Sequence, residues 1–577
     1  MLAILQILVI WPATPATGQT PAPEYLIHRN LRGKGGGSLV ASISADLSTF
    51  NRMLTSSLAN SIVADRLAGD LVHINRATFE LEPALASRWQ AEPDGRTYTL
   101  YLRRGLRFSD GSPFTADDVI FSFQVLQDPK VAADQSGQIL VDGAFPVVSK
   151  LDQYTVRISF PRPVGMGLRA LDSIPMLPRH LLQKAYLAGN LRTEYGPNAK
   201  PEAVVGMGPF KLKEHERGVK VVLERNPYYW KRDGAAQALP YLDTLTFLIL
   251  PDRNAEALRF QNGEIDIIYA LLPENYASLQ RYASRARYQI KNLGPGLGMD
   301  FLWFNLNPGR KPSGAPFVDP EKAAVFQKSE FRRAISIALN RDGMNRSIYL
   351  GLGEPQRGPV SSGNKVWLHP DLPKVRYEPA RARQLLAQCG LRDTNRDGVL
   401  EYGSRAAPFE INIHTARGRM DREKMAQVIK DNLSAIGIRV NLQFLLINEI
   451  AARFLGTFDY EAILFGITPT DIVPDLQTDL WYSSGRLHFW FPNQERPHYA
   501  WEAEIDALTS RLVRALDPAA RREAFNRIQE IWAVEMPAIP TIAPNILVGW
   551  KNGVGNVNPS ILVPYILWNA EELTVTP

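Results

Sequence analysis

One run of oxygen-bearing side chains has the spacing of a metal ligand set, Asp393-Thr394-Asn395-Arg396-Asp397-Gly398. Its oxygens fall at alternate positions and a glycine stands sixth, as in the first half of a calcium-binding loop. The twelfth position, which should carry a bidentate glutamate, is Ser404. A tight turn between a helix and a strand explains the same residues. The run therefore predicts either a calcium loop or a plain turn.

The other groups that could do chemistry are scattered. Of the eight histidines, the closest pair is His488 and His498, on an aromatic-rich stretch where packing or hydrogen bonding is favoured over metal binding. The sequence contains no phosphate loop, no nucleophile elbow and no His-Glu-x-x-His zinc pair, and the glycines of 294–298 do not have dinucleotide spacing. The single cysteine, Cys389, excludes an intrachain disulfide and a thiolate zinc site. We therefore expect no catalytic residue, no bound metal and no cofactor.

Aromatic side chains concentrate in the poorly periodic segment 481–501. Such rings could stack on peptide side chains, sugars or cations, or they could form the core beneath a loop. The sequence leaves both possibilities open. The residues concerned are Trp481, Tyr482, Phe489, Trp490, Phe491, Tyr499 and Trp501.

The elements that must position these side chains alternate between strand and helix patterns. Apolar and polar residues alternate over 98–102 and 154–160, which predicts two half-buried strands. Between them, Thr115 and two following aspartates have the pattern of a capped helix start. Further on, the spacing predicts a helix over 425–436, a strand over 438–444, and helices over 505–516 and 518–532, the last beginning at Asp517-Pro518.

Length and composition exclude several classes of protein. At about 150 residues per domain, 577 residues predict more than one domain. Hydrophobic residues at 45% and charged residues at 21% are typical of a globular protein and exclude a disordered or collagenous chain. The net charge of +6 is spread without a Lys/Arg block, so we expect no nucleic-acid partner.

The first thirteen residues, MLAILQILVIWPA, form an uncharged apolar stretch that leads into small residues. We interpret residues 1–20 as a secretory signal peptide, although no Lys or Arg precedes the apolar run. The stretch is too short for a membrane-spanning helix. A buried first strand or helix is the alternative. The sequence thus predicts a periplasmic or otherwise extracytoplasmic protein.

Several long motifs resemble one known family. The stretch 103–119, RRGLRFSDGSPFTADDV, is similar nearly position for position to the signature of the extracytoplasmic solute-binding proteins of family 5, the oligopeptide, dipeptide and nickel type that feed ABC importers. Residues 205–210 and 223–230, VGMGPF and LERNPYYW, resemble the second block of that family. The segments 263–266, 331–341 and 537–540 continue the resemblance, which covers about residues 37 to 545.

The resemblance implies an α/β, periplasmic-binding-protein-like fold of class II, with two lobes and an extra α/β subdomain in the first lobe. The implied first lobe comprises residues 37–70 and 191–294, and the extra subdomain comprises 71–190. The second lobe spans 295–495, and 496–577 would return to the first lobe and form the C-terminal segment. A ligand would bind in the cleft between the lobes, and the family motifs themselves identify the fold rather than the ligand.

The resemblance also suggests which residues meet the ligand. In peptide-binding relatives an aspartate that pairs with the ligand ammonium follows a buried strand of the second lobe. Here 458–466 resembles that strand, so Asp471 is the candidate and Asp475 the second, although one alignment puts Thr470 at that position. A solvated loop or cap carboxylate is the alternative. The other expected ligand-binding residues are Asn51, Trp303, Asn305, Trp481 and Trp490.

The function implied is that of a monomeric receptor that captures a peptide-like solute and delivers it to ABC permease subunits in the membrane. A receptor for a sugar, an opine, or a nickel or haem complex remains an alternative. So does a peptide-binding sensor or chaperone without transport. An enzyme on this scaffold would need a nucleophile or metal constellation that the sequence does not display.

Overall fold

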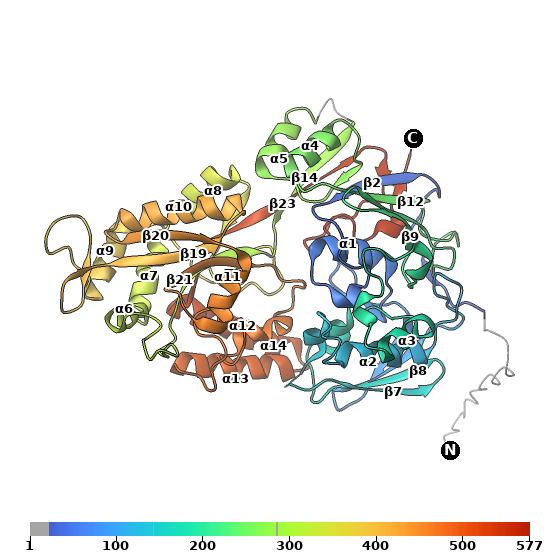
Figure 1. Cartoon of the computed structure of the whole chain (residues 1–577), viewed down its shortest axis with the longest axis horizontal. Coiled ribbons are helices and arrows are strands. Elements are labelled where there is room, and N and C mark those ends of the chain that lie inside the picture. The colour runs from blue at the N-terminus through green and yellow to red at the C-terminus, as the bar shows by residue number, and fades with distance from the viewer. Residues whose placement is uncertain (1–21, 142, 284–286, 577) are drawn as a thin grey trace, which may run out of the picture.

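The computed structural model describes residues 22–141, 143–283 and 287–576. The expected signal peptide at 1–20 lies outside the described residues. Figure 1 shows two lobes joined by a few strands. Each lobe contains most of one large hydrophobic cluster, and Ile74 and Leu562 of the first lobe join the cluster of the second. The prediction of a two-lobed α/β fold is therefore confirmed.

The first lobe is built on a four-stranded sheet in the order β2-β12-β10-β9, with β2 and β12 parallel. Gly206 and Gly208 lie so close to the last turn of α1 that a Cβ at either would overlap the backbone carbonyl of Leu67 or Arg66. The VGMGPF motif thus has a structural role. The elements are β1 (Leu26–His28), β2 (Ser38–Ile43), α1 (Leu58–Leu67), β3 (Val72–Ile74), β4 (Leu81–Pro83), β9 (Phe210–Glu216), β10 (Lys220–Arg225), β11 (Lys231–Asp233), β12 (Thr244–Ile249), β24 (Val554–Gly555) and β25 (Thr574–Val575).

The extra subdomain of the first lobe is an antiparallel sheet in the order β5-β6-β8-β7 that packs with two helices. Thr115 caps α2 as expected, because its hydroxyl accepts from the amide of Asp117 and Asp118 accepts from the amide of Thr115. The family-like stretch 103–119 therefore forms the turn and the start of this helix. The elements are β5 (Ala86–Ala91), β6 (Thr97–Leu102), α2 (Ala116–Gln127), β7 (Val147–Asp152), β8 (Thr155–Ser159) and α3 (Arg179–Leu187).

The second lobe has a five-stranded mixed sheet in the order β20-β19-β21-β15-β22, covered by helices. Its helices are α6 (Pro320–Phe326), α7 (Ser329–Ala338), α8 (Arg341–Tyr349), α9 (Pro379–Gln388), α10 (Met420–Ser434), α11 (Ile447–Ala452), α12 (Thr478–Trp481), α13 (Ala500–Arg514) and α14 (Pro518–Glu535). Its strands are β15 (Met299–Phe304), β19 (Glu410–Ala416), β20 (Arg439–Leu445), β21 (Ala462–Ile467) and β22 (Ala538–Pro540), together with the small pair β17 (Glu401–Tyr402) and β18 (Ala407–Pro408).

The chain crosses between the lobes at two neighbouring places. The strand β14 (Tyr288–Pro295) leads into β15, and β22 leads back into β23 (Ile542–Lys551). β14 pairs with β23, and β15 pairs with β22, so the two crossings run side by side. A small unit of α4 (Arg253–Gln261), α5 (Pro273–Gln280), β13 (Ile267–Ile268) and β16 (Gly353–Pro355) packs around β23. This paired connection is the hinge of the molecule.

The return to the first lobe occurs later than the expected boundary at residue 496. Helices α13 and α14 pack into the core of the second lobe through Ile505, Leu512 and Trp532. The first segment after them, β22, is still part of the second-lobe sheet. The chain therefore leaves the second lobe between β22 and β23. Among the described residues, no helix has the length and apolar character needed to cross a membrane.

Candidate functional site

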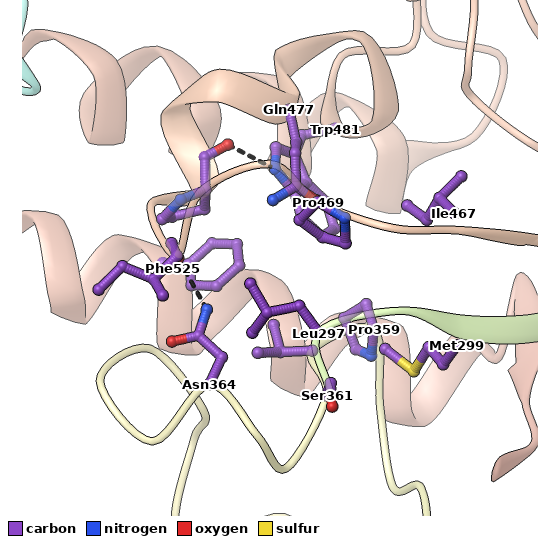
Figure 2. Close-up of a pocket in the computed structure, with 13 residues that line it drawn as sticks. Leu297, Met299, Pro359, Ser361, Asn364, Ile467, Pro469, Gln477, Trp481 and Phe525 are labelled. Atoms are coloured by element: carbon purple, nitrogen blue, oxygen red, sulfur yellow. Dashed lines mark hydrogen bonds between the residues drawn. The ribbon is translucent and has the colours of Figure 1, made fainter. Parts of the chain in front are cut away.

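A pocket lies in the second lobe beside the hinge (Figure 2). It forms where the start of β15, a loop after β16 and the loop after β21 meet. Its volume is about 20 Å³, enough for about one water molecule, so a solute group that enters must widen it. The lining residues are Leu297, Met299, Pro359, Val360, Ser361, Asn364, Ile467, Pro469, Ile472, Pro474, Gln477, Trp481 and Phe525, none of which is ionisable.

Two hydrogen bonds fix the loop after β21 over this pocket. The amide nitrogen of Asn364 donates to the carbonyl of Ile472 at 2.7 Å, and the indole nitrogen of Trp481 donates to the carbonyl of Pro474 at 3.0 Å (Figure 2). Both donors are buried side chains. The loop is therefore held by side chains from a distant loop and from α12.

Asp471, which was expected to meet a ligand ammonium, pairs with an arginine of the opposite lobe. Arg169 Nη2 donates to Asp471 Oδ1 at 2.7 Å, and Arg169 Nε donates to Oδ2 at 3.0 Å. The Asp471 side chain is only 4% exposed and that of Arg169 only 13%. Arg169 comes from a short 3-10 helix of the extra subdomain, Gly167–Leu171. The structure thus shows a bidentate ion pair that bridges the two lobes.

Asp475, the second candidate, lies inside the second lobe. Its Oδ2 accepts from Arg521 Nη2 of α14 at 2.6 Å, and its Oδ1 has no hydrogen-bond partner among the described residues. Burial raises the pKa of this carboxyl above its ordinary value, and the neighbouring guanidinium only partly offsets that effect. Asp475 is therefore placed to support α14 rather than to face the other lobe.

The remaining expected ligand residues lie in different surroundings. Trp481 lines the pocket, and it is buried against Phe525 and Trp532. Trp303 stacks on Phe489 in the second-lobe core, with ring centroids 4.6 Å apart. The structure brings Asp471 and Trp481 close to one pocket, but it does not place Trp303 among the residues that line it.

Asn305, Asn51 and Trp490 have protein partners of their own. The Asn305 amide donates to the carbonyls of Phe458 and Tyr460, which fixes the end of β15. Asn51 caps a 3-10 turn of the first lobe by accepting from the amide of Met53. Trp490 is fully buried in the second-lobe core. A ligand-binding role for these residues stays a prediction.

A buried carboxylate that the sequence did not indicate organises the aromatic segment. Glu502 of α13 is 0% exposed and accepts from the side chains of Trp490 and Gln494 at 2.8 and 2.9 Å. It also accepts from the backbone amides of His498 and Tyr499, and it contacts His488 at 3.2 Å. Trp481, Phe489 and Trp490 are buried in the core of the second lobe, and Phe491, Tyr499 and Trp501 pack against it while partly exposed. His488 contacts Glu502 and the carbonyl of Leu480, in agreement with the expectation of hydrogen bonding.

A second, larger cavity of about 90 Å³ lies in the first lobe, and its charged side chains pair with one another. Lys231 meets Glu571 at 2.8 Å, His73 meets Asp70 at 3.0 Å, and Arg66 donates to the carbonyl of Leu567. These internal pairs leave little free charge for a solute. We therefore place the candidate site at the second-lobe pocket instead.

The buried pair of Arg76 and Asp172 at this cavity makes stability depend on acid pH. Burial alone would raise the pKa of Asp172, but the charges of Arg76 and His73 outweigh it and hold the pKa at about 2. A carboxyl with a lowered pKa stabilises the fold above its ordinary pKa, and the stabilisation is lost as pH falls toward the lowered value. The pair should thus contribute about 2 kcal/mol near neutral pH.

We expect Asp172→Asn to lower the melting temperature strongly at pH 7 and less at pH 2.5, where the carboxyl is protonated in the unfolded chain and approaches its lowered pKa of about 2 in the folded one. The measurement is thermal unfolding followed by circular dichroism at pH 7, 4 and 2.5. Asp117→Asn is the matched control, because Asp117 is 42% exposed and pairs with Lys150 at the surface. An equal loss at every pH would contradict the assignment.

The run 393–398, expected to be either a calcium loop or a plain turn, forms an irregular bend. Carboxylate oxygens of Asp393, Asp397 and Glu401 lie within 4.8 Å of one another. Glu401 accepts from the amide and hydroxyl of Thr394, and Asp393 accepts from the amide of Gly398. These bonds are those of a self-contained turn. Calcium binding stays an alternative to the plain turn.

Comparisons with known proteins agree over most of the chain. The model of the bacterial extracellular solute-binding proteins, family 5 Middle, matches residues 80–488. A probable ABC transporter-binding protein of Deinococcus radiodurans is 26% identical over 539 residues, which cover 90% of this chain and 89% of that protein. A periplasmic alpha-galactoside-binding protein of Rhizobium meliloti is 28% identical over 415 residues, which cover 68% of this chain and 58% of that protein.

The oligopeptide-binding protein AppA of Bacillus subtilis is 26% identical over 506 residues, covering 86% of this chain and 85% of AppA. Its structure in complex with a nonapeptide resembles this one with a TM-score of 0.73 and 25% identity. That likeness covers 95% of this chain and 100% of the AppA chain. The likeness to AppA thus includes both lobes and the hinge.

Proposed function

Because this chain belongs to the bacterial extracellular solute-binding proteins of family 5, we propose that it captures a peptide-like solute between its lobes for an ABC importer. The bound solute would be delivered to permease subunits in the membrane. The family consists of binding receptors rather than enzymes, and we propose no covalent chemistry. We also propose export by the N-terminal segment, a periplasmic location and a monomeric state.

One observation carries the proposal. Two lobes, each built on its own large sheet, are connected by paired crossing strands, and a pocket lies beside those strands near an interlobe contact. Such a hinge can open and close, and a solute that contacts both faces favours the closed form. An extended peptide suits this arrangement, since its main chain can bond to both lobes whatever its side chains. The likeness to AppA supports the peptide class.

An uncharged sugar is the second candidate solute. The pocket lining offers apolar surface together with the hydroxyl of Ser361 and the amides of Asn364 and Gln477, and none of the lining residues is charged. The relative named for alpha-galactoside binding supports this alternative. A nickel or haem complex is less favoured, because no histidine is among the residues that line the pocket.

Native mass spectrometry of the purified full-length chain tests the proposal. We expect incubation with a tryptic peptide digest to give a 1:1 adduct whose mass matches a peptide. Incubation with raffinose is the parallel arm for the sugar alternative. A spectrum with only the unliganded mass in both arms would contradict the proposed function.

The pocket predicts the effect of one substitution on binding. Gln477→Trp should fill the pocket, because Gln477 is a half-buried lining residue. We expect the affinity for the captured solute to fall at least tenfold, and the free energy of unfolding to fall by about 1–3 kcal/mol because the pocket is overpacked, which leaves the variant folded. Isothermal titration calorimetry gives the affinity. Thr478→Trp, one residue away and outside the lining, is the control and should bind as wild type does.

A further inference from the structure

A carboxylate in the loop that lines the pocket is already neutralised. Asp471 lies between the lining residues Pro469 and Ile472, so a solute in the pocket lies close to it. Both of its oxygens accept hydrogen bonds from Arg169, and Oδ1 also accepts from the amide of Ile472 at 2.6 Å. A carboxylate so fully occupied has little capacity left for a cation of the solute.

Arg169 is anchored in its own lobe and is not a mobile surface arginine. Its Nη1 donates to the carbonyl of Phe79 at 2.5 Å, on the loop between β3 and β4. The guanidinium is therefore held by the first lobe and presented to the second. A solute ammonium that displaced it would leave a mostly buried guanidinium without its partner, which is strongly unfavourable.

The other groups near the pocket carry no free negative charge either. Asp475 is paired with Arg521 inside the second lobe. Of the residues that line the pocket, none is ionisable. A cation removed from water needs a carboxylate or several acceptors, so this surface gives a solute ammonium no added affinity.

We propose that Arg169 determines the charge class of the solute. By occupying Asp471, Arg169 leaves the second-lobe pocket neutral. The receptor therefore binds solutes that lack a free ammonium group about as tightly as solutes that carry one. This inference rests on the proposed function. It means that uncharged contacts in the pocket, and not an ion pair with the solute ammonium, select the solute.

The experiment uses two probes that differ only in charge, alanyl-leucyl-alanyl-leucine amide and its N-acetylated form. We expect the wild-type protein to bind both with dissociation constants within threefold in isothermal titration calorimetry. Arg169→Met should free Asp471 and vacate space between the lobes. That variant should prefer the free-amino peptide at least tenfold over the acetylated one.

Arg521→Met is the matched control. It removes the arginine partner of Asp475, the other aspartate of the same loop, and this pair is buried within the second lobe. It should show no preference between the probes. A wild-type preference of tenfold or more for the free-amino peptide would overturn the inference. So would an Arg169→Met protein that treats the two probes alike.

Failure of the proposed function gives a different result. If neither probe binds to the wild type or to Arg169→Met, the proposal of a peptide ligand is wrong. Thermal unfolding then tests the Arg169–Asp471 ion pair by itself. The melting temperatures of Arg169→Met, Asp471→Asn and the double variant form a cycle. A double variant no less stable than the singles supports the pairing, and additive losses overturn it.

Discussion

Replacing Glu502 with alanine should lower the free energy of unfolding of the second lobe by about 3–5 kcal/mol. The carboxylate is completely buried and accepts from two side chains and two backbone amides. Its removal leaves those donors inside the core without an acceptor, and each such donor costs about 1–3 kcal/mol. Urea unfolding followed by tryptophan fluorescence measures the loss, because Trp490 contacts the lost carboxylate.

Glu504 provides the matched control on the same helix. Its side chain is 47% exposed and pairs with Arg527 at the surface. We expect Glu504→Ala to change the free energy of unfolding by less than about 1 kcal/mol. Equal effects of the two substitutions would mean that Glu502 does not organise the aromatic segment.

Lys231→Met should cost the first lobe about 3–5 kcal/mol. Lys231 and Glu571 form a mostly buried pair at 2.8 Å that ties the C-terminal segment to β11. Burial would raise the pKa of Glu571, but the Lys231 ammonium outweighs it and holds the pKa at about 2. Methionine keeps the length of the side chain and removes its charge, so the carboxylate is left buried without a cation and keeps only the hydrogen bond from the Tyr229 hydroxyl at 3.3 Å.

A double substitution separates the lost pair from lost packing. In Lys231→Met with Glu571→Leu, both charges are replaced by apolar side chains of similar size, which is often near neutral for stability. We expect the double variant to recover most of the loss in urea unfolding. A double variant as unstable as the single one would show that packing around Lys231, rather than the ion pair, accounts for the effect.

The local elements of this fold could be predicted because their signals are local. The alternation over 98–102 became β6, and the Thr115 cap began α2 as expected. The lobe boundary at 496 was wrong because it depends on long-range packing, which leaves no local signal. An amphipathic helix such as α13 needs an apolar partner, but its sequence does not say which lobe supplies it.

The surroundings of the candidate site residues could be predicted less well than the elements that carry them. The sequence pointed to the loop of Asp471, but its partner Arg169 lies 302 residues away in another lobe, and no local pattern links them. Trp303 was expected at the cleft, and it is in the core because every residue of β15 is buried. A central strand that is covered on both faces shows no alternation of apolar and polar residues. The sequence therefore carries no signal for which side chains of β15 face the cleft and which face the core.

Energy transfer between two exposed labels tests most directly whether a solute is gripped between the lobes. Leu187→Cys in the first lobe and Met420→Cys in the second suit labelling, because these side chains are 74% and 64% exposed while Cys389 is buried. We expect a peptide digest to raise the transfer efficiency in a saturable way as the lobes close. An unchanged efficiency in protein that native mass spectrometry shows to hold a peptide would contradict binding between the lobes.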